Sequence, residues 1–480
     1  MEGIPVADDL CDLGVFDLAR LYRENRVSPV EVVKAHLQRC DRLNPILNAF
    51  LVVLRESALQ AARASEALFR AGVDLGPLQG IPVSVKDIIR VRGTRTTAAS
   101  RVLLDAPPDA SDAGVVQRLR AAGAILLGKT NLHEFATGDP DPAGPFGLVQ
   151  NPRQVGCHPG SSSSGAGAAA AAGLGVIAIG TDTGGSVRIP AYLCGVAGLK
   201  PTTGRIDLEG IIPLSWTLDS VGPLARRVKD VGAAWRALAG IPVCGSRCPG
   251  GGGPFPGTPD RAVRGWRLGI PKGDYFRLCQ PAVSGAFEET LAALRDSGCQ
   301  MMEFNPPGVE EMADLTMILT QAEGSAYHER HRDRDHLYHT AFRERVFPGR
   351  EMKALVYISA LRRRLELQEE WTRATHGYDA LVMPSGPAVA PPHGTDQVEI
   401  QGRIYPLRAA LSRFTRPASL LGWPALTLPN GASKDGLPTG IQLVAPAGGE
   451  ELLLALGSRL EEVLGGALNF SIEPCFPTGK

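Results

Sequence analysis

Stretches of helix-like sequence alternate along the chain with short apolar runs. Ser28, Pro29 and Glu31 predict the start of a helix, because a serine N-cap, a proline at the first helical position and a glutamate three residues after the cap suit a first turn. Further helical patterns cover 16–21, 58–71, 113–122, 166–172, 283–297, 312–326, 355–376 and 450–464. Apolar runs that predict strands cover 81–87, 124–127, 176–179, 266–270, 380–383, 425–428 and 440–444. This alternation predicts an α/β fold.

The composition is that of a globular protein and narrows the class of partner. Hydrophobic residues make up 44% of the chain and charged residues 21%, which leaves enough apolar surface to bury a core. The formal net charge is zero at pH 7, so the chain lacks the basic excess with which nucleic-acid-binding proteins hold phosphate groups. We therefore expect no nucleic-acid partner.

Neither a membrane segment nor a signal peptide is expected. Residues 1–22 lack the basic start and apolar stretch of a signal peptide, and the longest uncharged apolar run, 165–180, is too short and too rich in glycine and alanine to span a membrane. Nine cysteines are an odd number, and the close pair Cys244 and Cys248 has no matching second pair for a metal site. The sequence thus predicts a cytoplasmic protein with reduced thiols.

Two polar, glycine-flanked segments are candidates for chemistry. Residues 159–165 read Pro-Gly-Ser-Ser-Ser-Ser-Gly, and residues 180–188 read Gly-Thr-Asp-Thr-Gly-Gly-Ser-Val-Arg directly after an apolar strand. Glycines permit a tight turn in which successive N–H groups converge on a developing negative charge. Taken by themselves, these glycine-rich sequences fit a connecting loop after a strand equally well.

These segments and several others resemble the amidase signature family. The family's defining block is matched by residues 159–202, and its lysine segment by 80–87, which reads Gly-Ile-Pro-Val-Ser-Val-Lys-Asp. Further matches are Gly-Lys-Thr-Asn-Leu-His-Glu-Phe at 128–135, Gly-Trp-Pro-Ala at 422–425 and Gly-Leu-Pro-Thr-Gly-Ile-Gln at 436–442. They occur in order between about residue 15 and about residue 465. The resemblance implies a central mixed β-sheet covered by helices on both faces.

The resemblance also implies the roles of particular residues. The nucleophile would be Ser186, and the base would be Lys86. The second serine, which follows a cis peptide bond in the family, would be Ser162, because it lies 24 residues before Ser186; Ser163 is the alternative. The backbone N–H groups of residues 183–186, namely those of Thr183, Gly184, Gly185 and Ser186, would form the oxyanion hole. Two positions depart from the family pattern, because Ser161 replaces a glycine and Ala166 replaces a small polar residue.

These residue types suit acyl transfer. A serine hydroxyl is a weak nucleophile until a base takes its proton, and lysine can be that base only when it is neutral. Lys86 follows the apolar run 81–85, which favours burial and hence a lowered pKa. Ser162 would relay the proton between Ser186 and Lys86.

The resemblance implies a stand-alone amidase that cleaves small-molecule amides, or related carbamates such as urethanes, without a cofactor or metal. A homodimer is one option for its oligomeric state. The alternative is the glutamine-hydrolysing catalytic subunit of a tRNA-dependent amidotransferase. That subunit usually carries an acidic residue just before a late Phe-Thr pair, whereas residues 411–415 here read Leu-Ser-Arg-Phe-Thr. A third hypothesis, a degenerate binding protein, is disfavoured by the presence of Lys86, Ser162 and Ser186.

Two further patterns point to other functions and are rejected. Residues 123–130 fit the nucleotide-binding pattern GxxxxGKT, but the four intervening residues are Ala, Ile, Leu and Leu, which predict a buried strand instead of a phosphate loop. A cluster of histidines lies in a segment dense with arginine and aspartate, and it is interpreted as a solvated helix or lid: His328, His331, His336 and His339.

The walls of the substrate pocket are expected from 135–139 and from 315–350, with mainly apolar side chains. The candidates are Phe135, Leu315, Ile318, Tyr327, Phe342, Phe347 and Trp423, although aromatic residues such as Tyr327, Phe342, Phe347 and Trp423 more often lie in a core. On this basis neutral amides should be preferred over glutamine. We expect a single domain over 1–480, with N-terminal helices over 1–75, the catalytic core over 76–243, a variable loop or lid part over 244–350 and a C-terminal core part over 351–480.

Overall fold

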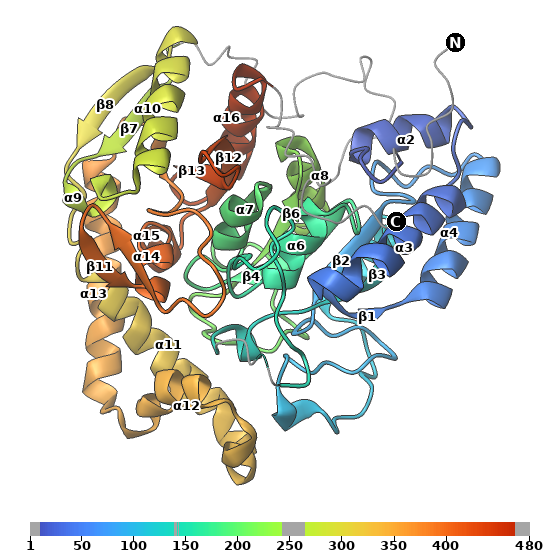
Figure 1. Ribbon diagram of the computed structural model, residues 1–480, viewed down its shortest axis with the longest axis horizontal. Helices are drawn as coiled ribbons and strands as arrows, with labels where there is room; N and C mark the ends of the chain where they lie inside the picture. Colours follow the sequence, from blue (N-terminus) through green and yellow to red (C-terminus); the bar gives the residue numbers. More distant parts are fainter. Residues whose placement is uncertain (1–9, 139–141, 143, 242–264, 466–480) are drawn as a thin grey trace.

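The computed structural model describes residues 10–138, 142, 144–241 and 265–465. Within these residues, eleven strands form one mixed sheet in the order β1-β3-β2-β4-β6-β5-β12-β13-β9-β7-β8 (Figure 1). The strands are β1 (Phe50–Val53), β2 (Pro82–Lys86), β3 (Ile125–Thr130), β4 (Ile177–Asp182), β5 (Ala197–Lys200), β6 (Ser220–Ala225), β7 (Arg267–Pro271), β8 (Gln300–Phe304), β9 (Ala380–Pro384), β12 (Ala425–Ala432) and β13 (Pro438–Val444). The predicted α/β fold with a central mixed sheet is confirmed. A separate hairpin pairs β10 (Gln397–Ile400) with β11 (Arg403–Pro406).

The helices of the described residues include all nine that were predicted, together with six that were not. They are α2 (Val15–Arg23), α3 (Pro29–Leu47), α4 (Arg55–Arg70), α5 (Gly114–Ala121), α6 (Ser164–Ala171), α7 (Arg188–Cys194), α8 (Val228–Leu238), α9 (Asp274–Arg277), α10 (Pro281–Asp296), α11 (Met312–His328), α12 (Thr340–Val346), α13 (Ala354–Ala374), α14 (Leu407–Ser412), α15 (Arg416–Leu421) and α16 (Glu450–Val463). Short 3-10 turns are η1 (Arg101–Leu103), η2 (Glu134–Ala136), η3 (Glu329–Leu337) and η4 (Phe347–Glu351).

The predicted start of α3 is confirmed in atomic detail. The Glu31 backbone N–H donates to Ser28 Oγ at 3.1 Å, and the Ser28 N–H donates to Glu31 Oε2 at 2.8 Å. Pro29 occupies the first helical position, where a missing N–H costs no hydrogen bond. The local sequence alone therefore determines where this helix begins.

Alternate residues of the strands face two different helical layers. In β3, Leu126 packs into the core that includes α5 and α8, while Ile125 and Leu127 pack against α3, α4 and α6. Further along the sheet, α10 and α16 share the first layer with α8, and α7 lies beside α6 on the opposite face (Figure 1). Both faces are thus buried, which explains why the central strands read as continuous apolar runs.

Parallel pairing brings two polar strand ends together. β2 runs parallel to both β3 and β4, so its last residue, Lys86, lies at the same edge as Asp182, the last residue of β4. The residues that follow Asp182 form the glycine loop, and α6, which begins at Ser164, packs across β2 and β4. The serine run, the glycine loop and the lysine therefore meet at one place.

The cysteines that the structure describes are all free and buried, as expected for reduced thiols. The predicted loop at 244–259, with Cys244 and Cys248, lies outside the described residues, as does Cys475. Over the described part of the chain, none of the helices has both the length and the apolar character that a membrane crossing requires.

Candidate active site

Lys86 is enclosed at the end of β2. Its side chain is fully buried, and its Nζ lies 2.9 Å from Ser162 Oγ and 2.9 Å from Thr181 Oγ1. The Ser161–Ser162 peptide bond is cis. The alternative serine, Ser163, does not bond to the lysine. Its hydroxyl donates instead to the Thr181 carbonyl oxygen at 3.1 Å. The structure thus places Ser162, and not Ser163, against the lysine.

Burial changes the acid–base behaviour of Lys86. The loss of hydration lowers the pKa of the Lys86 ammonium to about 7, although the carboxylates of Asp219 and Asp182 act to raise it. Lys86 is therefore neutral in a large fraction of molecules near neutral pH, which an exposed lysine would not be.

A buried ion pair shapes the glycine loop. Asp182 and Arg188 are both fully buried, and Arg188 Nη2 donates to Asp182 Oδ1 at 2.9 Å. Burial raises the pKa of Asp182, but Arg188 outweighs this and holds that pKa at about 2. The Asp182 carboxylate also accepts the Val187 N–H, at 3.1 Å. Gly185 has φ +130°, and a Cβ there would lie 2.2 Å from Thr415 Oγ1, so this turn requires glycine.

Three of the four expected oxyanion-hole donors are open, and the fourth is occupied. The N–H groups of Thr183, Gly184 and Ser186 have no hydrogen-bond acceptor within the described residues, and these three residues line the cleft described below. The Gly185 N–H instead donates to Asp182 Oδ1 at 2.8 Å. The expectation for Gly185 is therefore corrected, because the carboxylate three residues earlier folds back onto its amide.

Asp219 supports this loop, although it was not among the residues predicted from the sequence. Its Oδ1 accepts the Thr183 hydroxyl at 2.5 Å, and its Oδ2 accepts the Leu214 N–H at 2.9 Å and the Ser215 N–H at 3.1 Å. Burial raises the pKa of Asp219 to about 6, although these hydrogen bonds act to lower it. Asp219 is the one charged residue between Ile211 and Ala225. A single carboxylate in an otherwise uncharged segment is the sequence feature from which its role could have been suspected.

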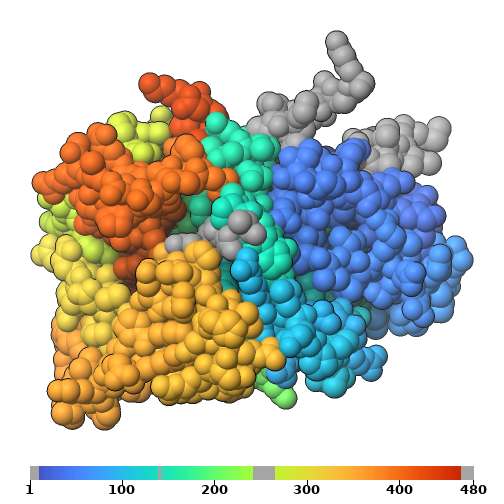
Figure 2. Space-filling model, turned by 60° about the horizontal axis from the view of Figure 1, so that its bottom comes forward, coloured from blue at the N-terminus to red at the C-terminus, as the bar shows by residue number. Residues whose placement is uncertain are grey.

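Ser162 and Ser186 open into the same cleft, whose volume is about 720 Å³. Its walls come from the residues after β3, from α11 and α12, and from the segment around β11 and α14. Figure 2 shows these segments meeting around a hollow on one face, with α11 and α12 in yellow-orange and the later segment in deeper orange. Ser186 is partly exposed there, and no hydrogen bond joins its hydroxyl to that of Ser162 in the described structure.

The cleft walls come in part from the predicted ranges 135–139 and 315–350 and are largely apolar, but none of the side chains predicted by name lines them. Phe135 and Phe342 pack with His328 and Tyr338 in an aromatic cluster, and Trp423 packs against Trp371. These rings bury their surface in the core of the segments that carry them, so they are absent from the cleft lining, as are the other candidates: Leu315, Ile318, Tyr327 and Phe347. The apolar lining comes from other side chains, among them Leu148, Ile189, Leu214, Met317, Leu407 and Leu411. Charged and polar side chains lie between them: Asp314, Thr316, Thr320, Gln321, Glu344, Arg345, Asp396, Arg408, Ser412 and Arg416.

The histidine cluster is not uniformly solvated as predicted. His328 is fully buried, and its Nδ1 lies 2.8 Å from the Tyr338 hydroxyl oxygen. Burial lowers the pKa of His328 to about 3. His336 is exposed, whereas His331 and His339 are half-buried. Within the described residues, no group of three or more His, Cys, Asp or Glu side chains is arranged to hold a metal ion.

The GxxxxGKT residues form part of strand β3. Lys129 is fully buried, and its Nζ lies 2.6 Å from Asp87 Oδ1 in an ion pair. Its ammonium also donates to Thr96 Oγ1 at 2.7 Å. The segment that would have to open a helix around a phosphate group is thus an interior strand of the sheet.

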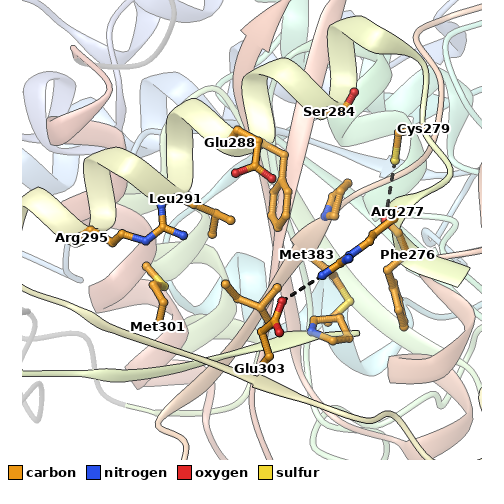
Figure 3. Close-up of a pocket in the computed structure, with 14 residues that line it drawn as sticks. Phe276, Arg277, Cys279, Ser284, Glu288, Leu291, Arg295, Met301, Glu303 and Met383 are labelled. Carbon is orange, nitrogen blue, oxygen red and sulfur yellow. Dashed lines mark hydrogen bonds and ion pairs between the residues drawn. The ribbon is translucent and has the colours of Figure 1, made fainter. Parts of the chain in front are cut away.

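Another cavity, of about 590 Å³, lies between α10 and strands β7, β8 and β9 (Figure 3). Arg277 donates to Glu303 Oε1 across it at 2.9 Å, and Met301 and Met383 form part of its apolar lining. It contains none of Lys86, Ser162 or Ser186. The cleft at the glycine loop is therefore the candidate active site.

Comparison with known proteins agrees with this geometry. The amidase family profile matches residues 31–454. The chain is similar to a subunit of the glutamyl-tRNA(Gln) amidotransferase of Roseiflexus sp. (strain RS-1), with 33% identity over 95% of this chain and 97% of that protein. It superposes on the crystal structure of an amidase with a TM-score of 0.86 and 34% identity, covering 94% of this chain and 100% of the other. It also superposes on 6-aminohexanoate cyclic dimer hydrolase in complex with its substrate, with a TM-score of 0.81 and 28% identity over 96% and 98% of the two chains. The chain therefore belongs to the amidase family and is a hydrolase that acts on the carbon–nitrogen bond of amides.

Proposed function

We propose that this chain hydrolyses small-molecule amides through Ser186, with Ser162 as proton relay and Lys86 as base. The observation that carries the proposal is the fully buried Lys86 amine, 2.9 Å from a serine hydroxyl that opens into the same cleft as Ser186. A lysine in this position, without an ion-pair partner among the described residues, is suited to exchange protons near neutral pH.

The proposed reaction begins when neutral Lys86 takes the proton of Ser162, which in turn takes the proton of Ser186. The Ser186 Oγ attacks the carbonyl carbon, and the resulting oxyanion accepts hydrogen bonds from the N–H groups of Thr183, Gly184 and Ser186. A small rotation of the Ser186 side chain completes the relay, as is common when substrate binds.

Collapse of this intermediate breaks the carbon–nitrogen bond. The proton held by Lys86 returns through Ser162 to the departing nitrogen, which leaves as a neutral amine or ammonia. An acyl group then remains on the Ser186 Oγ. Water attacks this ester while its proton passes to Lys86 by the same route. The proton then returns through Ser162 to the Ser186 Oγ as the bond to the acyl carbon breaks, and the carboxylic acid is released. Because the oxyanion hole contacts only the carbonyl oxygen, carbamates such as urethanes are proposed substrates as well.

The acid limb of the pH profile should report Lys86. Since only the neutral amine accepts a proton, kcat/KM should fall about tenfold per pH unit below an apparent pKa near 7 and level off above it. The measurement is kcat/KM for a neutral amide between about pH 5 and pH 9. An acid limb with an apparent pKa near 10, the value of an exposed lysine, would contradict the assignment.

The amidotransferase subunit is the second candidate, since the relative from Roseiflexus carries that name. In this chain Ser412 and Arg413 occupy the positions where that subunit usually has an acid, and Ser412 Oγ donates to the Arg408 carbonyl oxygen at 2.7 Å. A glutamine ammonium group would thus find no carboxylate at this place.

Glutamine and glutaramate, which is glutamine without its α-ammonium group, separate the two candidates. The purified chain alone should hydrolyse glutaramate with a kcat/KM at least about tenfold higher than glutamine, a difference of about 1.4 kcal/mol in transition-state binding. Ammonia release is measured for both on one preparation. A tenfold preference for glutamine, or activity only with a copurifying partner, would favour the amidotransferase subunit.

A further inference from the structure

Three arginines of the described chain line the catalytic cleft, and they differ in their partners. Arg345 and Arg408 both donate to the Thr137 carbonyl oxygen, and Arg408 Nη2 also donates to Thr137 Oγ1 at 2.6 Å. Arg416 lines the same cleft, but in the described part of the chain its guanidinium has no hydrogen-bond acceptor and no ion-pair partner within bonding distance. Of the three, Arg416 alone is left unengaged by these contacts.

Arg416 lines the same cleft as the proposed oxyanion hole, and the residue before it contacts the glycine loop. The hydroxyl of the preceding residue, Thr415, donates to the Gly184 carbonyl oxygen at 2.7 Å, and the Thr415 carbonyl accepts Arg188 Nη1 at 2.7 Å. Arg416 then begins α15, which packs against α11. Across the cleft, α11 comes close to the loop, since a Cβ on Gly184 would lie 4.0 Å from Thr316 Cγ2. The backbone of Arg416 is thus anchored one residue from a contact with the glycine loop, by hydrogen bonds that do not involve its own charge.

The environment of Arg416 favours an anionic partner. The side chain is only half-exposed, and this burial lowers its pKa, although arginine remains charged at neutral pH. A guanidinium has five N–H donors and no acceptor, so a partly desolvated one without a protein partner has hydrogen bonds to offer a ligand. Its planar fork matches the two oxygens of a carboxylate.

We propose that Arg416 binds a carboxylate carried by the substrate, so that the preferred substrates are short amides of dicarboxylic acids. The inference rests on the proposed function of the cleft and specifies its substrate class. The substrate must be short because Thr415, one residue away, already contacts the loop that would hold the scissile carbonyl.

Asp314 on α11 is the main competing charge. It is exposed, it lines the cleft, and its carboxylate raises the pKa of Arg416 without forming an ion pair with it. Since a bound carboxylate would be repelled by Asp314, Asp314→Asn should raise kcat/KM for an anionic amide more than for a neutral amide.

The test compares glutaramate with 5-oxohexanamide, a neutral amide of the same shape in which a methyl ketone replaces the carboxylate. Arg416→Gln should lower kcat/KM for glutaramate by about 30-fold, as expected for loss of a charge-assisted pair, while changing that of the ketone by less than about twofold. Arg416→Lys should recover part of the loss, because it restores the charge without the fork.

Arg413→Gln is the matched control. It removes the same charge three residues away, but Arg413 lies over the Tyr275 ring at 4.5 Å and does not line the cleft. The control should keep the preference for glutaramate. An equal loss on both amides in Arg416→Gln, or the same change of preference in Arg413→Gln, would overturn the proposal.

Hydrolysis by the unmodified chain tests the proposed function, and binding to an inactive variant tests the role of Arg416. If neither amide is hydrolysed by the unmodified chain, the proposed function fails. The carboxylate site is then tested by calorimetric titration of glutaramate into Ser186→Ala, where adding Arg416→Gln should weaken binding at least about tenfold. Absence of binding to Ser186→Ala, or equal binding by both variants, would overturn the role of Arg416.

Discussion

Ser186→Ala is expected to abolish amide hydrolysis while leaving the fold intact. Ser186 is partly exposed at the cleft, and the described structure gives its hydroxyl no hydrogen bond, so removing that oxygen should change the free energy of unfolding little. Without the oxygen no acyl-enzyme can form, and turnover should fall by a factor of about a thousand or more. The measurement is kcat/KM together with the thermal midpoint.

Ser164→Ala is the matched control for this variant. Ser164 belongs to the same serine run, it is buried, and its hydroxyl has no partner within the described residues. The Ser164→Ala variant should retain most of the activity, because Ser164 belongs to α6 and lies outside the cleft lining. Full activity in Ser186→Ala together with loss in Ser164→Ala would refute the assignment of the nucleophile.

Lys86→Met should lower kcat/KM by about a thousandfold or more, because the residues of a catalytic relay act as a unit. Methionine fills much of the same volume without an amine, so the loss measures the base more than a cavity. The remaining activity should lack the acid limb near pH 7 that the neutral form of Lys86 produces.

Lys200→Met separates the base from the general effect of losing a buried lysine. Lys200 is also fully buried, and burial together with Arg188 lowers its pKa to about 7, but its ammonium donates to the Pro201 carbonyl oxygen and it does not line the cleft. The Lys200→Met variant should still show the acid limb of kcat/KM near pH 7, even if its free energy of unfolding is lower. A Lys86→Met variant that retains most activity would exclude the role of Lys86.

Local sequence was sufficient for much of the fold. The capping residues around Ser28 place the start of α3, and the apolar run before Lys86 predicts a buried strand with the lysine at its end. Both features depend on neighbours in the chain, which the sequence displays directly. The roles of Lys86, Ser162 and Ser186 were expected from the family resemblance. The structure places the buried Lys86 amine against Ser162, which opens into the same cleft as Ser186.

Other features depend on contacts between distant segments and could not be predicted. Asp219 accepts a hydrogen bond from Thr183 of the glycine loop, which lies 36 residues earlier in the chain. Arg416 lies at the cleft because its neighbour Thr415 contacts Gly184, which is 231 residues away in sequence. The aromatic residues expected in the walls were misplaced for a related reason. Hydrophobicity indicates that Phe342 is buried, but it does not indicate whether the ring faces a cleft or the core of its own segment.

Identification of the residue that a fluorophosphonate probe modifies tests the central claim most directly. The probe is attacked by an activated serine, and mass spectrometry of the digested protein locates the adduct. We expect a single adduct on Ser186, formed in the unmodified chain and strongly slowed in Lys86→Met. An adduct on Ser162, Ser163 or Ser164, or equal labelling of Ser186 without Lys86, would contradict the proposed mechanism.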